Sequence, residues 1–124
     1  MKAASLSALA IVAAFVTHFV VTSPWSIAKE LPPAADKLAE LLAIGEPIYV
    51  ARCKECHGAA GGGFVGPKLV GNDRLANAGP VIRQITGGGA DMPAFRNRLT
   101  ADEILAVGTY VRNSWGNSYG ILPR

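Results

Sequence analysis

The segment Cys53-Lys54-Glu55-Cys56-His57 contains both cysteines of the 124-residue chain and one of its two histidines. Two thiols separated by two residues and followed at once by a histidine have the spacing of a c-type haem attachment site. On a helical turn, each thiol can add across one vinyl group of the porphyrin, and the imidazole then lies within reach of the iron. The segment therefore predicts one covalently bound haem c, held through Cys53 and Cys56, with His57 as an axial ligand.

Two other kinds of site also use a Cys-x-x-Cys pair. A thioredoxin-like dithiol normally lies between a strand and a helix, whereas this pair follows a segment of helical periodicity and precedes a glycine-rich loop. A four-ligand zinc site needs more cysteines or histidines than the chain supplies, because the other histidine, His18, lies in an apolar stretch. Haem attachment is therefore the favoured hypothesis.

A candidate for the sixth iron ligand is Met92, the only methionine apart from the initiator. Glycines before it and Pro93 after it predict an exposed turn rather than a core position on a helix face. Ligation by histidine and a thioether raises the reduction potential of a haem. Because it also fills both axial positions, we expect the iron to transfer electrons rather than to bind oxygen or peroxide.

The favoured function is a single-electron carrier without catalytic residues, which is not itself an enzyme. Two alternatives stay open at this point. If Met92 is not an iron ligand, the chain is a haem peroxidase or a gas-binding protein. The haem can also serve a structural purpose in a subunit of a larger membrane complex.

Length and composition indicate one modest domain, since 124 residues are too few for two cores. The formal charge of +3 is too small to predict nucleic acid as a partner. We expect an all-α fold with few helices and long loops around one haem. The first helix leads into the cysteine pair, because its apolar residues recur at steps of three and four. Pro47 is expected to kink this helix or to begin a shorter one.

Two later helices have clear end signals. Pro80 suits the first position of a short helix that is ended by Gly87, Gly88 and Gly89. Thr100 followed by Glu103 is a capping box for a final helix. The apolar stripe expected on that helix consists of Ile104, Val107, Gly108 and Val111.

Residues 1–25 are predicted to be a signal-anchor or a signal peptide. Nineteen residues from Ala3 to Val21 carry no formal charge and follow Lys2. The run 3–21 is nearly long enough to span a bilayer and is followed by Trp25 as an interfacial residue, so we expect an anchor on the periplasmic side of the inner membrane. Cleavage after Ala28 is the alternative and would leave a soluble periplasmic protein. Residues 26–36 are expected to be a linker.

Taken together, these marks resemble the class I cytochrome c family over roughly residues 37–116, which makes 37–124 the predicted cytochrome c domain. The resemblance depends on the CKECHG segment, on Pro67 ten residues after His57, and on the pair Met92-Pro93. It implies that Gly45, Tyr49, Val107 and Tyr110 pack where the first and last helices cross. It also implies that the carbonyl of Pro67 accepts the Nδ1 proton of His57.

The last part of the resemblance concerns partners. The segment VRNSWGN, residues 111–117, resembles cytochrome subunits or domains of periplasmic dehydrogenases and haem-copper oxidases. The implied partners are redox proteins: a dehydrogenase, a cytochrome bc-type complex or a terminal oxidase.

Overall fold

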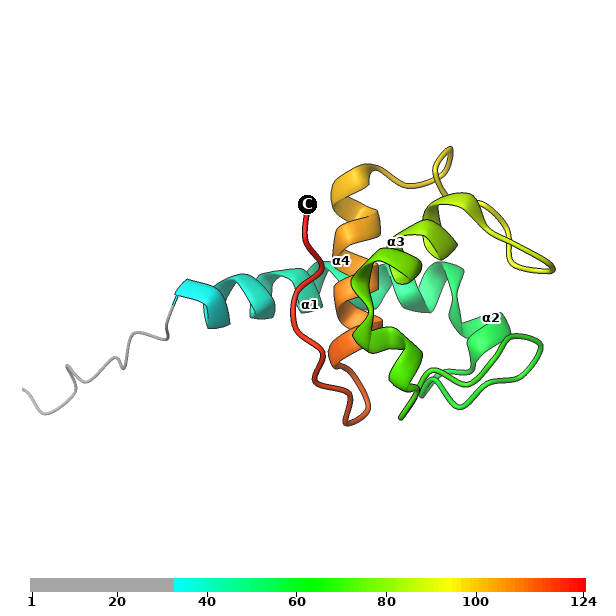
Figure 1. The fold of residues 1–124 in the computed structure, drawn as a ribbon, viewed down its shortest axis with the longest axis horizontal. Helices are drawn as coiled ribbons and strands as arrows, with labels where there is room; N and C mark the ends of the chain where they lie inside the picture. Colours follow the sequence, from blue (N-terminus) through cyan, green and yellow to red (C-terminus); the bar gives the residue numbers. More distant parts are fainter. Residues whose placement is uncertain (1–32) are drawn as a thin grey trace, which may run out of the picture.

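The computed structural model describes residues 33–124, which form helices joined by long loops (Figure 1). The helical segments are α1 (Pro33–Arg52), α2 (Lys54–His57), the 3₁₀ turn η1 (Asp73–Ala76), α3 (Ala78–Gly87) and α4 (Ala101–Asn113). No strand forms in this part of the chain beyond an isolated bridge between Gly89 and Met92. The all-α class is confirmed for these residues. The apolar helix expected within residues 1–25 lies outside them.

The centre of the domain is the steep crossing of α1 and α4 (Figure 1). Gly45 is buried on α1 and faces the backbone carbonyl of Ala106 on α4. A Cβ atom at Gly45 would lie 2.7 Å from the Cβ of Tyr110, which is closer than real side chains approach. The predicted packing of Gly45 at this crossing is therefore confirmed, because only a hydrogen side chain allows the two backbones to come this close.

An aromatic cluster lies beside the crossing. The ring centroids of Tyr49 and Tyr110 are 5.5 Å apart, and Trp115 lies 4.9 Å from Tyr49 and 5.5 Å from Tyr110. Tilted and edge-on pairs at these distances each contribute about 0.5–1.5 kcal/mol beyond area burial. The cluster joins α1, α4 and the turn that follows α4, and Tyr49 is fully buried within it.

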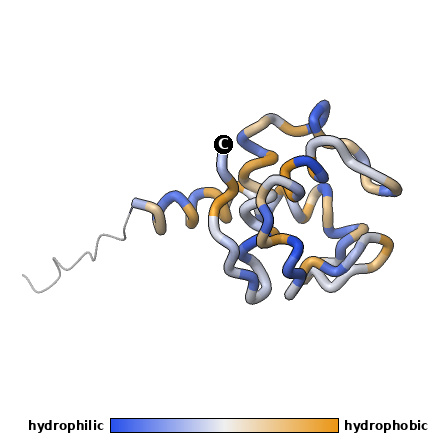
Figure 2. Tube along the Cα trace, in the orientation of Figure 1, coloured by the Kyte–Doolittle hydropathy of each residue, from blue (hydrophilic) through white to orange (hydrophobic). Residues whose placement is uncertain are grey.

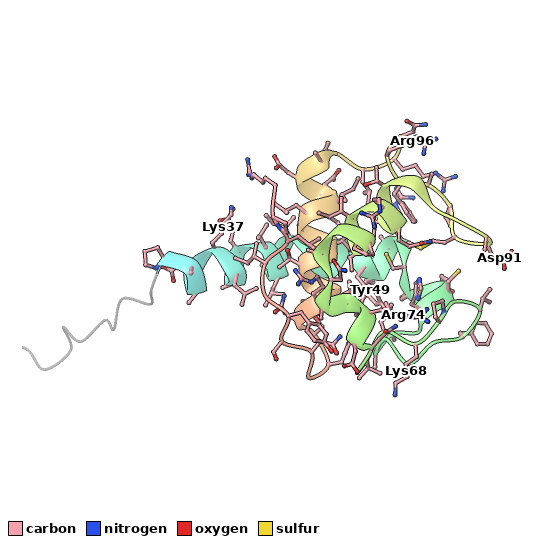
Figure 3. All side chains as sticks on the ribbon, in the orientation of Figure 1. Lys37, Tyr49, Lys68, Arg74, Asp91 and Arg96 are labelled. Carbon is pink, nitrogen blue, oxygen red and sulfur yellow. The ribbon has the colours of Figure 1, made fainter. Side chains whose placement is uncertain are left out.

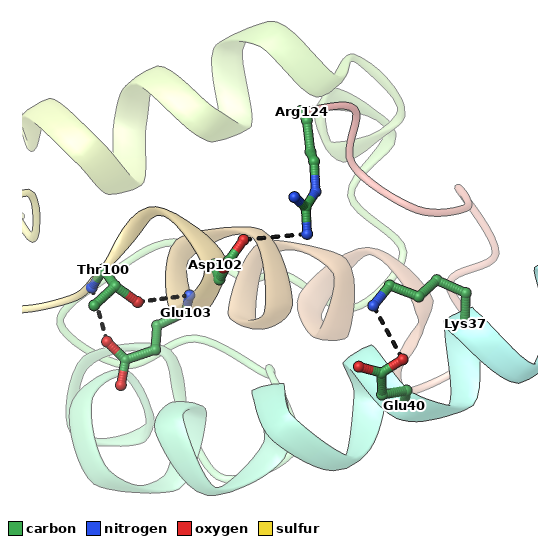
Figure 4. A network of polar contacts seen from close by, with 6 residues as sticks. All are labelled: Lys37, Glu40, Thr100, Asp102, Glu103 and Arg124. Atoms are coloured by element: carbon green, nitrogen blue, oxygen red, sulfur yellow. Dashed lines mark hydrogen bonds and ion pairs between the residues drawn. The ribbon is translucent and has the colours of Figure 1, made fainter.

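Helix α4 has the capping box that its sequence predicts. The Thr100 hydroxyl accepts from the Glu103 amide at 3.2 Å, and the Glu103 carboxylate accepts from the Thr100 amide at 2.7 Å (Figure 4). The stripe of Ile104, Val107, Gly108 and Val111 is buried as expected. Figure 4 also shows the ion pairs Lys37–Glu40 and Asp102–Arg124. Each is solvent-exposed and contributes less than about 1 kcal/mol.

Three proline positions refine the predicted helix limits. α1 continues through Pro47, so the alternative of a shorter helix beginning there is wrong. α1 begins at Pro33, so its first turn includes the last residues of the expected 26–36 linker. α3 begins at Ala78 rather than at Pro80. Pro80 is tolerated at the third position because amides in a first turn have no partner within the helix.

The C-terminal tail packs along α4 and buries Leu122. Arg112 holds it there, because its buried guanidinium donates to the carbonyls of Leu75, Ala76, Tyr119 and Gly120 at 2.6–3.1 Å. Burial lowers the pKa of Arg112 from its usual value. These acceptors compensate for the desolvation of the charge. Arg112 therefore fastens the η1 turn and the tail to the same helix.

Apolar and polar residues alternate along the helices (Figure 2), and α3 and α4 each bury one apolar face. Among residues 33–124, no helix is both long and apolar enough to cross a membrane. The predicted membrane span concerns residues 3–21, which lie outside this range.

We predict that Gly45→Ala lowers the free energy of unfolding by about 1–3 kcal/mol, because the added methyl must displace the backbone of α4. Thermal unfolding followed by circular dichroism measures this loss. Gly87→Ala is the matched control, since a Cβ at this helical glycine meets no atom within 4 Å. Equal stability losses in the two variants would contradict the close crossing.

Candidate haem attachment site

The attachment segment continues directly from α1. The Cys53 amide donates to the Tyr49 carbonyl at 2.8 Å, and the His57 amide donates to the Cys53 carbonyl at 2.9 Å. Cys53 and Cys56 are therefore three positions apart on nearly helical backbone, where side chains point to the same side. Cys53 is half-buried, Cys56 is exposed, and both are free thiols. This arrangement suits two thioether bonds to one edge of a porphyrin.

The pKa of the Cys53 thiol helps to distinguish haem attachment from a thioredoxin-like dithiol site. Burial, assisted by the neighbouring Cys56, raises the pKa of the Cys53 thiol to about 11. A dithiol redox site needs a thiolate near neutral pH, and its pKa is therefore lowered rather than raised. The environment of Cys53 disfavours thioredoxin-like chemistry.

The His57 imidazole is buried, with 8% of its surface exposed. Its Nδ1 lies 2.9 Å from the carbonyl oxygen of Pro67. A carbonyl oxygen can only accept, so Nδ1 carries the proton and Nε2 presents its lone pair, as an iron ligand must. The contact implied by the family resemblance is therefore present, and the donor set fits a haem.

Glycines bring the loop after His57 against the imidazole. The Gly63 amide donates to the His57 carbonyl at 2.7 Å, and the Gly66 amide donates to the Cys56 carbonyl at 2.8 Å. A Cβ at Gly66 would lie 2.8 Å from Cε1 of His57 and 3.0 Å from its Nδ1. Gly66 thus allows the loop to cradle the ring, and this approach aligns Pro67 with Nδ1.

Met92 lies in a tight turn after α3. Gly89 and Met92 exchange both backbone hydrogen bonds, each at 2.9 Å. Gly88 precedes them with a φ of 68°, and a Cβ there would collide with the backbone of Met92–Ala94. The predicted exposed turn is confirmed, and the Met92 side chain is half-buried within it.

Three contacts of this region are not predicted by the sequence. Gln84 donates from Nε2 to the Met92 sulfur at 3.5 Å. The Tyr49 hydroxyl donates to the Gly58 carbonyl at 2.6 Å, and burial raises the pKa of this phenol to about 12. Trp115 packs against Gly61, where a Cβ would lie 2.6 Å from the indole ring. The motif VRNSWGN includes Trp115, but no pattern in the sequence predicts the contact between Gln84 and Met92.

Within residues 33–124, no three side chains of His, Cys, Asp or Glu gather as a metal site. A haem needs no such cluster, because the porphyrin itself supplies four nitrogen ligands to the iron.

Comparisons with known proteins show which family this chain resembles. A family model described as cytochrome c oxidase, cbb3-type, subunit III matches residues 40–111. Cytochrome c6 of Leptolyngbya boryana is 35% identical over 74 residues, which cover 56% of this chain and 87% of that protein. Cytochrome c6 of Rippkaea orientalis is 39% identical over 87 residues, which cover 64% of this chain and 74% of that protein.

Two further matches add a subunit and a solved structure. The cytochrome c subunit of a quinone alcohol dehydrogenase from Gluconacetobacter polyoxogenes is 32% identical over 88 residues, which cover 59% of this chain but only 19% of that subunit. The crystal structure of cytochrome cL from Methylophaga aminisulfidivorans superposes with a TM-score of 0.57 at 28% identity and covers 72% of each chain.

The attachment turn, the imidazole with Nδ1 on a carbonyl, and these matches define a class I monohaem c-type cytochrome. Because the family model spans more than half of its residues, the chain belongs to the cytochrome c oxidase cbb3-type subunit III family. It binds one covalent haem c and transfers electrons through it.

We predict that Gly66→Ala destabilises the holoprotein by about 1–3 kcal/mol, because its methyl group overlaps the His57 ring. Urea unfolding followed by haem absorbance measures this change. Gly62→Ala alters the same loop at a position where a Cβ meets nothing within 4 Å, and its effect should stay within about 0.5 kcal/mol. A Gly66→Ala protein as stable as Gly62→Ala would show that the loop does not press on the imidazole.

Proposed function

We propose that this chain is a single-electron carrier in which His57 and Met92 are the two axial ligands of a haem attached through Cys53 and Cys56. The observation that carries the proposal is the 2.9 Å contact between His57 Nδ1 and Pro67 O. It fixes the ring tautomer and directs Nε2 as the ligand atom. The exposed turn around Met92 and its Gln84 contact support the second ligand.

When bound, the haem supplies a one-electron couple between ferric and ferrous iron. The axial side chains and their hydrogen bonds set the reduction potential of this couple. A thioether at position 92 favours the ferrous state and raises the reduction potential, whereas a carbonyl on Nδ1 makes the imidazole a stronger donor and lowers it. With both axial positions filled by side chains, the protein transfers electrons without catalysing a reaction.

An exposed apolar surface beside the attachment site supports a protein partner. Phe64 is 83% exposed and Val65 is 69% exposed, although most large apolar side chains of residues 33–124 are covered. Both lie in the loop that bonds to Cys56 and His57, which Figure 2 shows as an apolar outer turn. Brief electron-transfer encounters bury little area, and this pair suits such a contact with a redox protein, a dehydrogenase or an oxidase.

The labelled cations lie on two sides of the described domain. Figure 3 shows Lys68 and Arg74 on one side and Arg96 on the opposite side, with Asp91 at the tip of an outer loop between them. Lys54 lies 3.8 Å from the Glu55 carboxylate, which offsets its charge. We therefore assign partner contact to the apolar turn, with Lys68 as its flanking charge.

We further propose that residues 3–21 send the domain across the inner membrane and hold it there on the periplasmic side. The support is the uncharged run of nineteen residues after Lys2, with Trp25 behind it. A tethered domain would exchange electrons with a membrane oxidase or a periplasmic dehydrogenase as its cytochrome subunit.

We predict that Met92→Ala keeps the haem attached but lowers the reduction potential by roughly 0.1–0.3 V, a part of the ≈ 0.8 V range that axial ligands command. The weak red absorption band of iron–methionine bonding should disappear, and azide should bind the ferric protein. Redox titration and visible spectroscopy check these outcomes.

Asp91→Ala is the matched control for this prediction, since it changes an exposed residue of the same turn. It should keep the red band and nearly the wild-type potential. If Met92→Ala also keeps both, Met92 is not a ligand, and a peroxidase or gas-binding function gains support.

A further inference from the structure

The motif at residues 111–117 ends in a sharp reversal after α4. Trp115 and Gly116 have φ values of 55° and 88°. A left-handed φ is uncommon for a bulky residue and costs about 1 kcal/mol or more, so the surroundings must favour this turn. The Asn117 amide then donates to the Ser114 carbonyl at 3.0 Å. The reversal returns Asn117 to the side of α4.

The Asn117 side chain is buried, with 7% of its surface exposed. Its Nδ2 donates to the carbonyls of Leu69 at 3.1 Å and Val111 at 2.9 Å. Its Oδ1 accepts from the Gly71 amide at 2.9 Å. One amide group therefore joins α4 to the loop 69–71 and uses both of its donors.

This loop is the continuation of the segment that touches the imidazole. Leu69 lies two residues after Pro67, whose carbonyl accepts from His57 Nδ1. The Leu69 and Val70 amides both donate to the Gly61 carbonyl at 2.7 and 3.0 Å, and Trp115 packs on Gly61. The turn after α4 thus contacts both the start and the end of the loop that surrounds His57.

We propose that Asn117 is a positioning residue for His57, and this inference rests on the proposed role of His57 as an iron ligand. By fixing Leu69 and Gly71 against α4, the Asn117 amide keeps the Pro67 carbonyl on Nδ1. Loss of the amide lets the loop move away, which weakens the bond to Nδ1, reduces the basicity of the imidazole and raises the reduction potential.

The chain offers a closely matched control in Asn113. Its Nδ2 donates to the carbonyls of Thr109 at 2.7 Å and Gly120 at 3.0 Å, and its Oδ1 accepts from the Gly120 amide at 2.9 Å. Asn113 has the same side chain and the same number of hydrogen bonds near the same end of α4. It fastens the C-terminal tail, however, and its side-chain hydrogen bonds go to Thr109 and Gly120 rather than to the loop 66–71 that carries Pro67.

The experiment compares Asn117→Ala and Asn113→Ala in the full-length holoprotein. Both variants should lower the unfolding temperature. Asn117→Ala alone should raise the reduction potential and speed exchange of the His57 Nδ1 proton in NMR spectra about tenfold, the change expected for loss of one buried hydrogen bond. Equal potentials and exchange rates in the two variants would overturn the proposal.

A second measurement keeps the test decisive if Asn117→Ala does not fold. In the wild-type protein, the Gly71 amide proton and the His57 Nδ1 proton should become exchangeable in the same local opening, with the same dependence on low urea concentrations. Exchange of the His57 proton while the Gly71 proton stays protected would refute the coupling. Absence of iron-shifted His57 ring signals would instead refute the proposed function.

Discussion

The close contact of Gly45 with the backbone of α4 sets the geometry of the whole domain. α1 carries the attachment turn at its C-terminal end, and α4 carries the reversal with Trp115 and Asn117 at its own. The distance between these two ends depends on how closely the helices cross. A larger side chain at Gly45 would therefore affect the aromatic cluster and the loop that surrounds His57, as well as the crossing itself.

The same constraint explains how a small domain can hold an imidazole in one orientation. The backbone of His57 is fixed by the helical turn from Cys53, and its imidazole ring is fixed by the carbonyl of Pro67. Gly66 lets the loop approach the ring, and Asn117 and Trp115 hold the outer part of that loop. Orientation of the ligand is thus a tertiary property to which both long helices contribute.

The parts of this structure that depend on local chemistry follow from the sequence. The attachment turn, the capping box at Thr100 and the exposed turn at Met92 each depend on a few neighbouring residues. The Gly45 crossing and the Pro67 contact came from the family resemblance, because nothing local specifies which glycine meets which helix. The predicted start of α3 at Pro80 is wrong, since the helix begins at Ala78 and proline is tolerated within a first turn. Contacts such as Gln84–Met92 and Asn117–Leu69 join distant residues and have no sequence pattern.

Every functional statement about this chain depends on thioether bonds between its two cysteines and one porphyrin. The most direct measurement is the intact mass of the purified full-length protein under denaturing conditions. We expect a polypeptide mass increased by one haem that persists in denaturant, and the same spectrum shows whether residues 1–28 are retained. A mass equal to the bare polypeptide, with the porphyrin released on unfolding, would contradict it.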